Sequence, residues 1–246
     1  MTEPLKDPTA AFAEELAKQL PVKAAYRDVV KPGAKQAGQM VQDLVKTIQL
    51  ALAPLQFAGA YQDRLRSFID RSVRGIPEAD RVSPPPQILG PIVEGIRYEP
   101  EGTSLDGMFS ELLSSSMDAT RLRNAHPAFV AIIKSLSPDE AKLLISLADQ
   151  PVDRVSWSSY DKQRNFFDAP VVEQMAVPDD LSFPENISVF LEHLQQLGLV
   201  QTIALKAQEP TFAGGAQNGV RHHERHQLTG WGRQFICACT AKKPAE

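Results

Sequence analysis

The sequence predicts a mainly α protein, with a helical N-terminal half and a small α+β winged-helix-like module at the C-terminus. Three observations carry this prediction. Apolar residues recur at helical spacing through most of the chain. Ser137, Pro138 and Glu140 form a capping-box signature, in which a serine and a glutamate satisfy each other's backbone amides at a helix start. After residue 182, the order is helix, two extended segments and a final helix.

The N-terminal region is predicted to be a leader followed by a helical domain. Prolines break residues 1–37, so we expect a mobile leader with one short helix over residues 10–20. From Gly38 to Arg74 the apolar residues keep a helical period, which predicts a long helix or a helical hairpin with a kink at Pro54.

The helical domain is expected to extend over residues 38–124. Ser83 and the three prolines after it predict a stiff extended connector, because each proline fixes its own torsion and restricts the residue before it. Ile88, Ile92 and Ile96 follow at a spacing of four. Residues 105–117 then predict a cleaner amphipathic helix that ends near Asp118.

The winged-helix-like module is predicted over residues 125–240, before a tail at 241–246. One helix begins at His126 and Pro127, with His126 as a cap or a buried hydrogen-bonding residue, and the next begins at Ser137. Ser182 and Glu185 predict a second capping box, for a helix that ends at Gly198. We expect strands over 200–207 and 220–228, a glycine-rich tip between them, and a final helix capped by Thr229.

Composition sets limits on the class of protein. The chain has 246 residues, 43% of them hydrophobic, and a net charge of -4, which argues against general affinity for nucleic acid or anionic membrane. Cys237 and Cys239 are too close in sequence for an unstrained disulfide, so we expect reduced thiols. The first 20 residues lack the apolar core of a signal peptide. We therefore expect a cytoplasmic protein.

Three blocks of sequence resemble the abortive infection alpha family, a bacterial family associated by name with phage resistance. The blocks lie at Leu52 to Arg64, Pro84 to Pro91 and His126 to Ala141, and the likeness runs from about Gly38 to about Thr240. The resemblance implies a bacterial cytoplasmic protein and a component of phage defence. It implies no catalytic residues, because the family has none established.

The histidines of residues 222–226 and the two cysteines could form a metal site instead of having only structural roles. His222 and His226 would share one face of a strand, and Cys237 and Cys239 could supply soft ligands. The spacing nevertheless differs from known zinc motifs: position 227, where a second histidine would fall, holds glutamine. We therefore interpret the histidines as solvated and the cysteines as small core residues, and expect no cofactor.

Nucleic acid and membrane are the alternative partners. Arg221, Arg225 and His223 could contact a phosphate backbone, but the helix before them, over 185–198, has no Lys or Arg. The uncharged run at 47–62 is 16 residues long and too short to span a bilayer, which takes about 20. The arginines that follow it could form a basic face toward a membrane or a partner: Arg64, Arg66, Arg71 and Arg74.

The sequence also lacks nucleophile-elbow, phosphate-loop and dinucleotide-binding signatures. The leading hypothesis is therefore a non-enzymatic cytoplasmic protein of phage defence that acts through protein–protein contacts. A DNA-binding regulator is the first alternative, and a membrane-acting effector that uses the run at residues 50–57 is the second.

Overall fold

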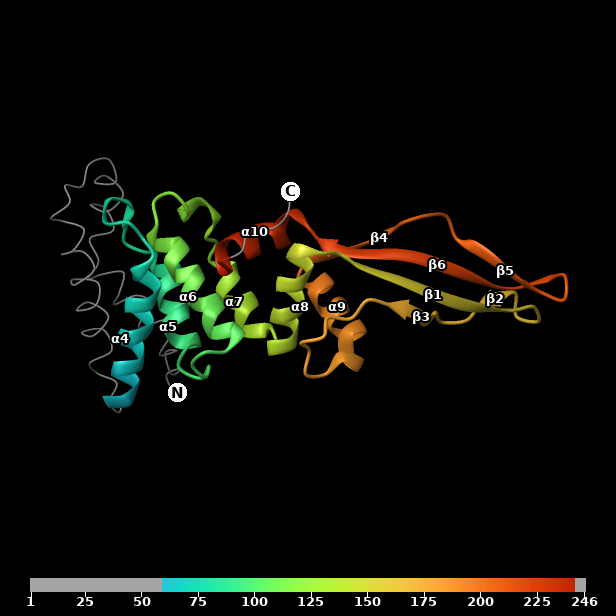
Figure 1. Cartoon of the computed structure of the whole chain (residues 1–246), viewed down its shortest axis with the longest axis horizontal. Helices are drawn as coiled ribbons and strands as arrows, with labels where there is room; N and C mark the ends of the chain where they lie inside the picture. Colours follow the sequence, from blue (N-terminus) through green and yellow to red (C-terminus); the bar gives the residue numbers. More distant parts are fainter. Residues whose placement is uncertain (1–58, 242–246) are drawn as a thin grey trace, which may run out of the picture. The chain divides into compact units, whose positions relative to one another are not determined.

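The computed structural model describes residues 59–241, which form two compact units (Figure 1). The first unit holds residues 59–135 together with 238–241, and the second holds residues 136–237. The predicted leader at 1–37, and the uncharged run up to residue 58, lie outside the described residues.

Four helices build the first unit within residues 59–135. They are α4 (Gly59–Arg74), α5 (Pro86–Gly95), α6 (Ser104–Met117) and α7 (Ala128–Ser135), with 3-10 turns at Glu78–Asp80 and Leu122–Asn124. The middle helix, α6, contacts the other three and buries Leu112, Leu113 and Met117 almost completely. The predicted amphipathic helix at 105–117 is thus confirmed. His126 caps α7, because its Nδ1 accepts a hydrogen bond from the Ala128 amide at 3.1 Å.

The second unit contains an antiparallel sheet of six strands within residues 136–237. The strands are β1 (Val152–Asp161), β2 (Phe166–Phe167), β3 (Val171–Met175), β4 (Val200–Ala204), β5 (Glu209–Ala213) and β6 (Ala216–Leu228). The two long strands, β1 and β6, pair from Val152↔His226 to Ser159↔Gly219. On the other side of β6 lie β4 and β5, and on the other side of β1 lie β3 and β2.

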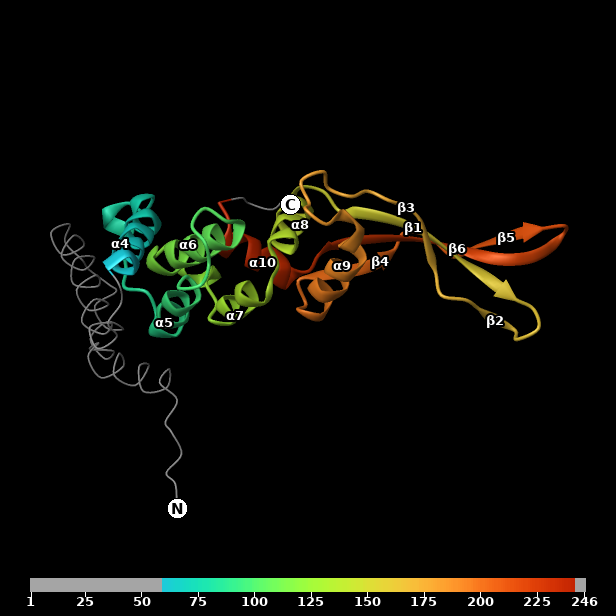
Figure 2. The ribbon, with the colours of Figure 1, turned by 90° about the horizontal axis from the view of Figure 1, so that it is seen from below.

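The far end of this sheet divides into two hairpins (Figure 2). Pairing between β1 and β6 stops at Ser159↔Gly219, and beyond that point β1 pairs only with β2, and β6 only with β5. At the other end of the sheet lie α8 (Pro138–Asp149) and α9 (Ile187–Gln196), which contact β6 and β4 respectively. The last helix, α10 (Gly230–Cys239), follows β6 directly.

The predicted fold class, mainly α with a winged-helix-like module, is therefore wrong. The expected wing has two strands, whereas the structure has six, three of them in residues 152–175, where no strand is predicted. The first predicted strand, at 200–207, ends at Ala204, and β5 follows it. The tip is also shorter than expected, because the turn residues are Gly214 and Gly215 alone, while Asn218 and Gly219 already belong to β6.

Three predicted helix ends in this unit are confirmed. The capping box of α8 is confirmed: Ser137 Oγ accepts the Glu140 amide at 3.2 Å, and Glu140 Oε2 accepts the Ser137 amide at 2.6 Å. Gly198 ends α9 with a φ of 71°, as predicted, and Thr229 caps α10 by accepting the Gly232 amide at 2.9 Å.

The predicted capping box of Ser182 and Glu185 is wrong. A 3-10 turn at Pro184–Asn186 precedes α9, whose N-cap is Asn186 and has no side-chain cap. The Ser182 and Phe183 amides instead donate to the buried Asp139 carboxylate, at 2.9 and 2.8 Å. Burial would raise the pKa of Asp139, but these hydrogen bonds and that of Lys142 together lower it.

We predict that Ser137→Ala lowers the free energy of unfolding by about 1 kcal/mol, because the first turn of α8 loses a side-chain acceptor. Urea denaturation followed by circular dichroism measures the change. The control is Ser146→Ala, which alters a half-buried serine later in the same helix. Equal effects of the two substitutions would contradict a specific role for the cap.

Candidate interaction surface

The two faces of the sheet differ in burial. Along β6 the even-numbered residues Val220, His226 and Leu228 are buried, and the residues paired with the first two, Ser158 and Val152 of β1, are buried with them. Because side chains alternate across a strand, the odd-numbered residues of β6 and their neighbours form the opposite face. We call this opposite face the outer face.

Charged side chains on the outer face form ion pairs with each other. Arg221 donates to Glu173 at 2.5 and 3.0 Å, and Arg225 donates to Asp153 at 2.6 and 2.9 Å. The hydrogen bonds from these arginines lower the pKa of Glu173 and Asp153. A further contact on this face joins His223 Nε2 to Glu209 Oε2 at 3.2 Å, and the same carboxylate forms an ion pair with Lys206 Nζ at 2.9 Å.

These pairs involve the residues that the nucleic-acid alternative requires. Arg221, Arg225 and His223 lie on one face of β6, as the strand prediction requires, but each is already bound to a carboxylate of a neighbouring strand. A phosphate would have to displace that carboxylate. The structure thus gives them a pairing role in the sheet, which the sequence analysis missed because the acids come from β1, β3 and β5.

Apolar side chains are exposed between these pairs. Val171, Ile203 and Leu205 are 64%, 37% and 44% exposed. The register places all three on the outer face: Val171 is opposite Trp157, Ile203 is opposite Arg225, and the Leu205 amide donates to His223 O. The outer face therefore combines neutralised charge with exposed apolar area, a composition found in protein–protein interfaces.

Trp157 adds a rigid element to this face. Its indole lies over Gly219, where a Cβ atom would overlap the ring, and its Nε1 donates to Thr211 Oγ1 of β5 at 2.9 Å. One side chain of β1 thus reaches across β6 to β5. This cross-strand contact holds β5 in the sheet, although β5 pairs with β6 alone.

The four metal candidates lie in two elements. On β6, the His222 ring is 3.5 Å from Ser158 Oγ, and His226 Nδ1 is 2.9 Å from Thr202 Oγ1. In α10, Cys239 is buried and Cys237 is half-buried, and neither forms a disulfide. Within residues 59–241 there is no group of three His, Cys, Asp or Glu side chains that could hold a metal ion.

The arginines of α4 fall into two groups. Arg64 and Arg71 both approach the buried carboxylate of Asp106, and Arg71 Nη2 lies 2.8 Å from Asp106 Oδ2. Arg64 also donates to the Glu99 carbonyl and pairs with Glu101. Arg66 and Arg74 are exposed. The predicted basic face toward a membrane or partner is thus partly used inside the first unit, to neutralise Asp106.

Fold and surface together define a two-unit α+β protein whose antiparallel sheet has an outer face of paired charges and exposed apolar side chains. The described helices include none that is long and apolar enough to cross a bilayer.

The chain belongs to the abortive infection alpha family, whose model matches residues 57–239. This confirms the resemblance stated from the three sequence blocks, and it associates the chain with abortive infection, a bacterial defence against phage. No curated protein and no solved structure matches the chain.

Proposed function

We propose that this chain acts in phage defence by binding a protein partner through the outer face, without catalysing a reaction itself. The observation that carries the proposal is the position of Val171, Ile203 and Leu205 on that face, among two arginine–carboxylate ion pairs and the His223–Glu209 contact. Burying apolar side chains favours association, and charges that are already paired need no partner to neutralise them. The proposal places the chain in the bacterial cytoplasm, where thiols such as Cys237 stay reduced.

Charge pairing also favours protein over nucleic acid as the partner. Binding to a phosphate backbone depends on unpaired cations that replace counterions. The arginines that the DNA hypothesis requires, Arg221 and Arg225, are held by two hydrogen bonds each. A nucleic acid would gain little from them, because the acids left behind would lose their partners.

The same reasoning applies to catalysis, because a side-chain pair that could act in a reaction already has structural partners. A short His–carboxylate contact in the second unit joins His193 Nδ1 to Glu140 Oε1 at 2.6 Å. The other oxygen of Glu140 caps α8 through the Ser137 amide, so the carboxylate already has a structural role. We therefore interpret this pair as a link between α8 and α9.

We predict that Ile203→Asp with Leu205→Asp abolishes phage protection in a bacterium that depends on this chain. Two buried aliphatic contacts together correspond to a loss of binding of about 100-fold or more. Plaque counts measure protection, and quantitative co-purification from infected and uninfected cells measures partner binding. The control is Val189→Asp, which places the same charge at an exposed apolar position of α9.

Two outcomes would contradict the proposal. One is full protection by the doubly substituted chain with an unchanged melting temperature. The other is a salt-sensitive mobility shift of DNA that Arg221→Ala and Arg225→Ala weaken, since this would assign the face to nucleic acid.

A further inference from the structure

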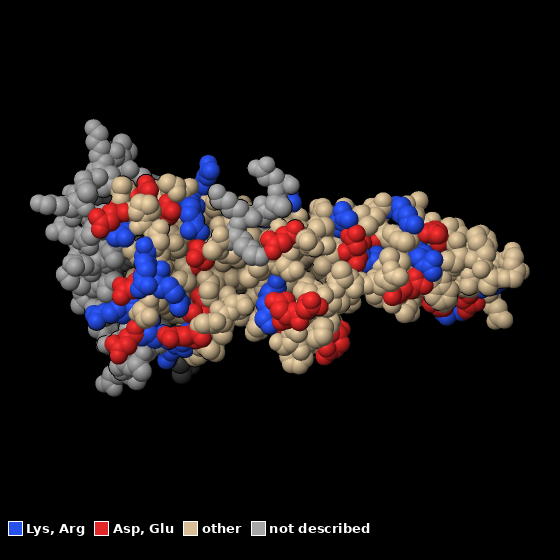
Figure 3. Space-filling view, in the orientation of Figure 1, with Lys and Arg blue, Asp and Glu red and all other residues tan. Residues whose placement is uncertain are grey.

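The tip of the β5–β6 hairpin is apolar and uncharged. Residues 210–220 contain no Asp, Glu, Lys or Arg, and Phe212, just before the turn, is 67% exposed. In the space-filling view the end of the sheet is free of charged side chains over this stretch (Figure 3). Most of the Phe212 ring is therefore not used in the packing of the second unit and is accessible to a contact outside it.

The backbone presents this tip as a narrow projection. Gly214 and Gly215 have φ values of 58° and 78°, which give the tight turn, and only the pairs of Phe212 with Gln217 and Ala213 with Ala216 precede it. Pairing with β1 has already ended, so from 216 to 218 the strand β6 pairs with β5 alone. Residues 212–215 at the tip are exposed.

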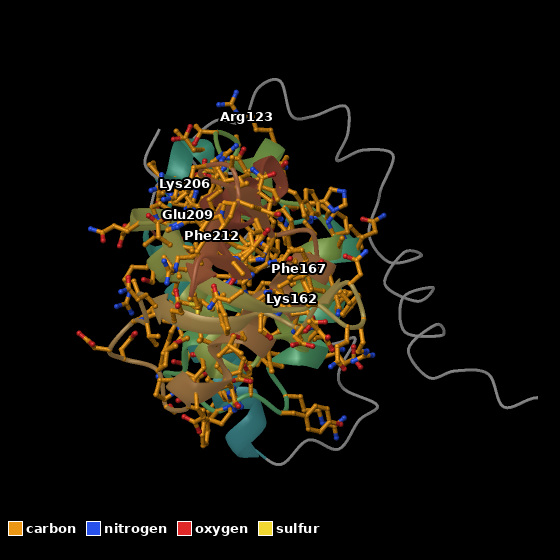
Figure 4. The ribbon with its side chains drawn as sticks, turned by 90° about the vertical axis from the view of Figure 1, so that its right-hand side faces the viewer. Arg123, Lys162, Phe167, Lys206, Glu209 and Phe212 are labelled. Atoms are coloured by element: carbon orange, nitrogen blue, oxygen red, sulfur yellow. The ribbon has the colours of Figure 1, made fainter. Side chains whose placement is uncertain are left out.

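The neighbouring β1–β2 hairpin ends in a similar way. Phe166 and Phe167 are consecutive on β2 and therefore point to opposite faces, and both are exposed. Figure 4, which looks onto this end of the sheet, labels Phe167 and Lys162 on this hairpin and Phe212 on the other. The divided end thus has aromatic rings on more than one side.

Cations accompany these rings. Lys162 and Arg164 are exposed in the turn of the β1–β2 hairpin. The nearby acids are held close to the backbone: Asp161 Oδ1 accepts the Gln163 and Arg164 amides at 2.9 and 3.1 Å, and Asp168 accepts the Ser159 hydroxyl. Both acids thus accept local hydrogen bonds, whereas Lys162 and Arg164 form no ion pair with any residue from 59 to 241.

We propose that this divided end inserts Phe212 and the aromatic rings of β2 into the surface of an anionic lipid bilayer. A protein partner with one flat surface covers one face of a strand, whereas lipid headgroups and acyl chains can surround a narrow tip on all sides. Aromatic side chains favour the bilayer interface, and Lys162 and Arg164 would lie at the level of the phosphates. The contact uses different residues from the outer face.

Co-sedimentation of the purified full chain with vesicles tests the proposal. We expect binding to phosphatidylcholine–phosphatidylserine vesicles and weaker binding to pure phosphatidylcholine. Phe212→Ser should lower the partition coefficient by about tenfold, the contribution of one buried ring. Lys162→Glu with Arg164→Glu should lower binding to the anionic vesicles by at least about tenfold. The control is Val189→Ser, an exposed apolar residue of α9.

Three results would overturn the inference: no binding of the unmodified chain to either vesicle, binding that Phe212→Ser leaves unchanged, or sedimentation velocity showing that Phe212→Ser dissociates an oligomer while vesicles stay unbound. The last would assign the tip to a second copy of the chain. Because Ile203 and Leu205 are not altered, these results are independent of the test of the proposed function.

Discussion

Gly232→Ala is expected to lower the free energy of unfolding by about 3 kcal/mol, because the added methyl group has no space. A Cβ atom at Gly232 would overlap the carbonyl oxygen of Leu199 and lie 2.9 Å from its carbonyl carbon. Both obstacles are backbone atoms, so a change of rotamer cannot relieve them. Either the first turn of α10 or the segment after α9 has to move.

Hydrogen bonds resist that movement. The Thr229 amide donates to Leu199 O at 2.9 Å, the Thr229 hydroxyl donates to Gly198 O at 2.6 Å, and the Gly232 amide donates to Thr229 Oγ1. Shifting α10 away from Leu199 breaks this set together. The substitution therefore tests how firmly the end of α9 is joined to the start of α10.

Gly230→Ala is the matched control, two residues away in the same helix. A Cβ atom there would meet nothing within 4 Å, so we expect an unchanged or slightly higher stability, by up to about 1 kcal/mol, from the lower entropy of the unfolded chain. Urea titrations of both variants measure the difference. If Gly232→Ala is as stable as Gly230→Ala, the close approach of α10 to Leu199 is wrong.

Acidification from pH 6.5 toward pH 5 is expected to destabilise the fold through His226. This side chain is 1% exposed, and burial, with a further contribution from Arg154, lowers its pKa to about 4, although Glu224 partly opposes the shift. Its Nδ1 lies 2.9 Å from Thr202 Oγ1, and its Nε2 makes no hydrogen bond with any residue from 59 to 241. A proton on this ring would be buried without an acceptor.

The sign follows from linkage. Between pH 6.5 and about pH 4 the unfolded chain binds a proton at His226 and the folded chain does not, so stability falls as pH falls. The slope approaches about 1.4 kcal/mol per pH unit, and the total loss is on the order of 3 kcal/mol. Above pH 6.5 the full contribution of His226 to the free energy of unfolding is present.

Urea titrations between pH 5 and pH 7.5 measure this slope. We expect His226→Gln to flatten it, whatever its effect on stability at pH 7.5. The control is His223→Gln, which removes a histidine from the outer face and should keep the slope. A slope that persists in His226→Gln would show that another group is responsible.

Elements with local signals could be predicted from the sequence. The capping box at Ser137, the stripe of α6 and the end of α9 at Gly198 each depend on residues a few positions apart. The strand β1 has no such signal, because its buried positions include Ser156 and Ser158. Both of its faces mix polar and apolar side chains, so hydrophobic periodicity does not identify a core-facing side.

The candidate surface could be predicted only in part. The sequence places Arg221, His223 and Arg225 on one face of a strand, which suggests a basic surface. Glu173 and Asp153 neutralise the two arginines from strands that are distant in sequence. The exposure of Phe166 and Phe212 follows from the end of the pairing between β1 and β6, which comes before both residues in the sheet and has no signal in the sequence.

By itself, the sequence determined the family, the helix caps and the apolar faces of the helices, because these follow from side chains within a turn or two of one another. Only the tertiary structure decided the six-stranded sheet, the neutralised charges of the outer face and the exposed rings at its divided end. Strand pairing joins residues far apart along the chain, and no local pattern records which acid meets which arginine.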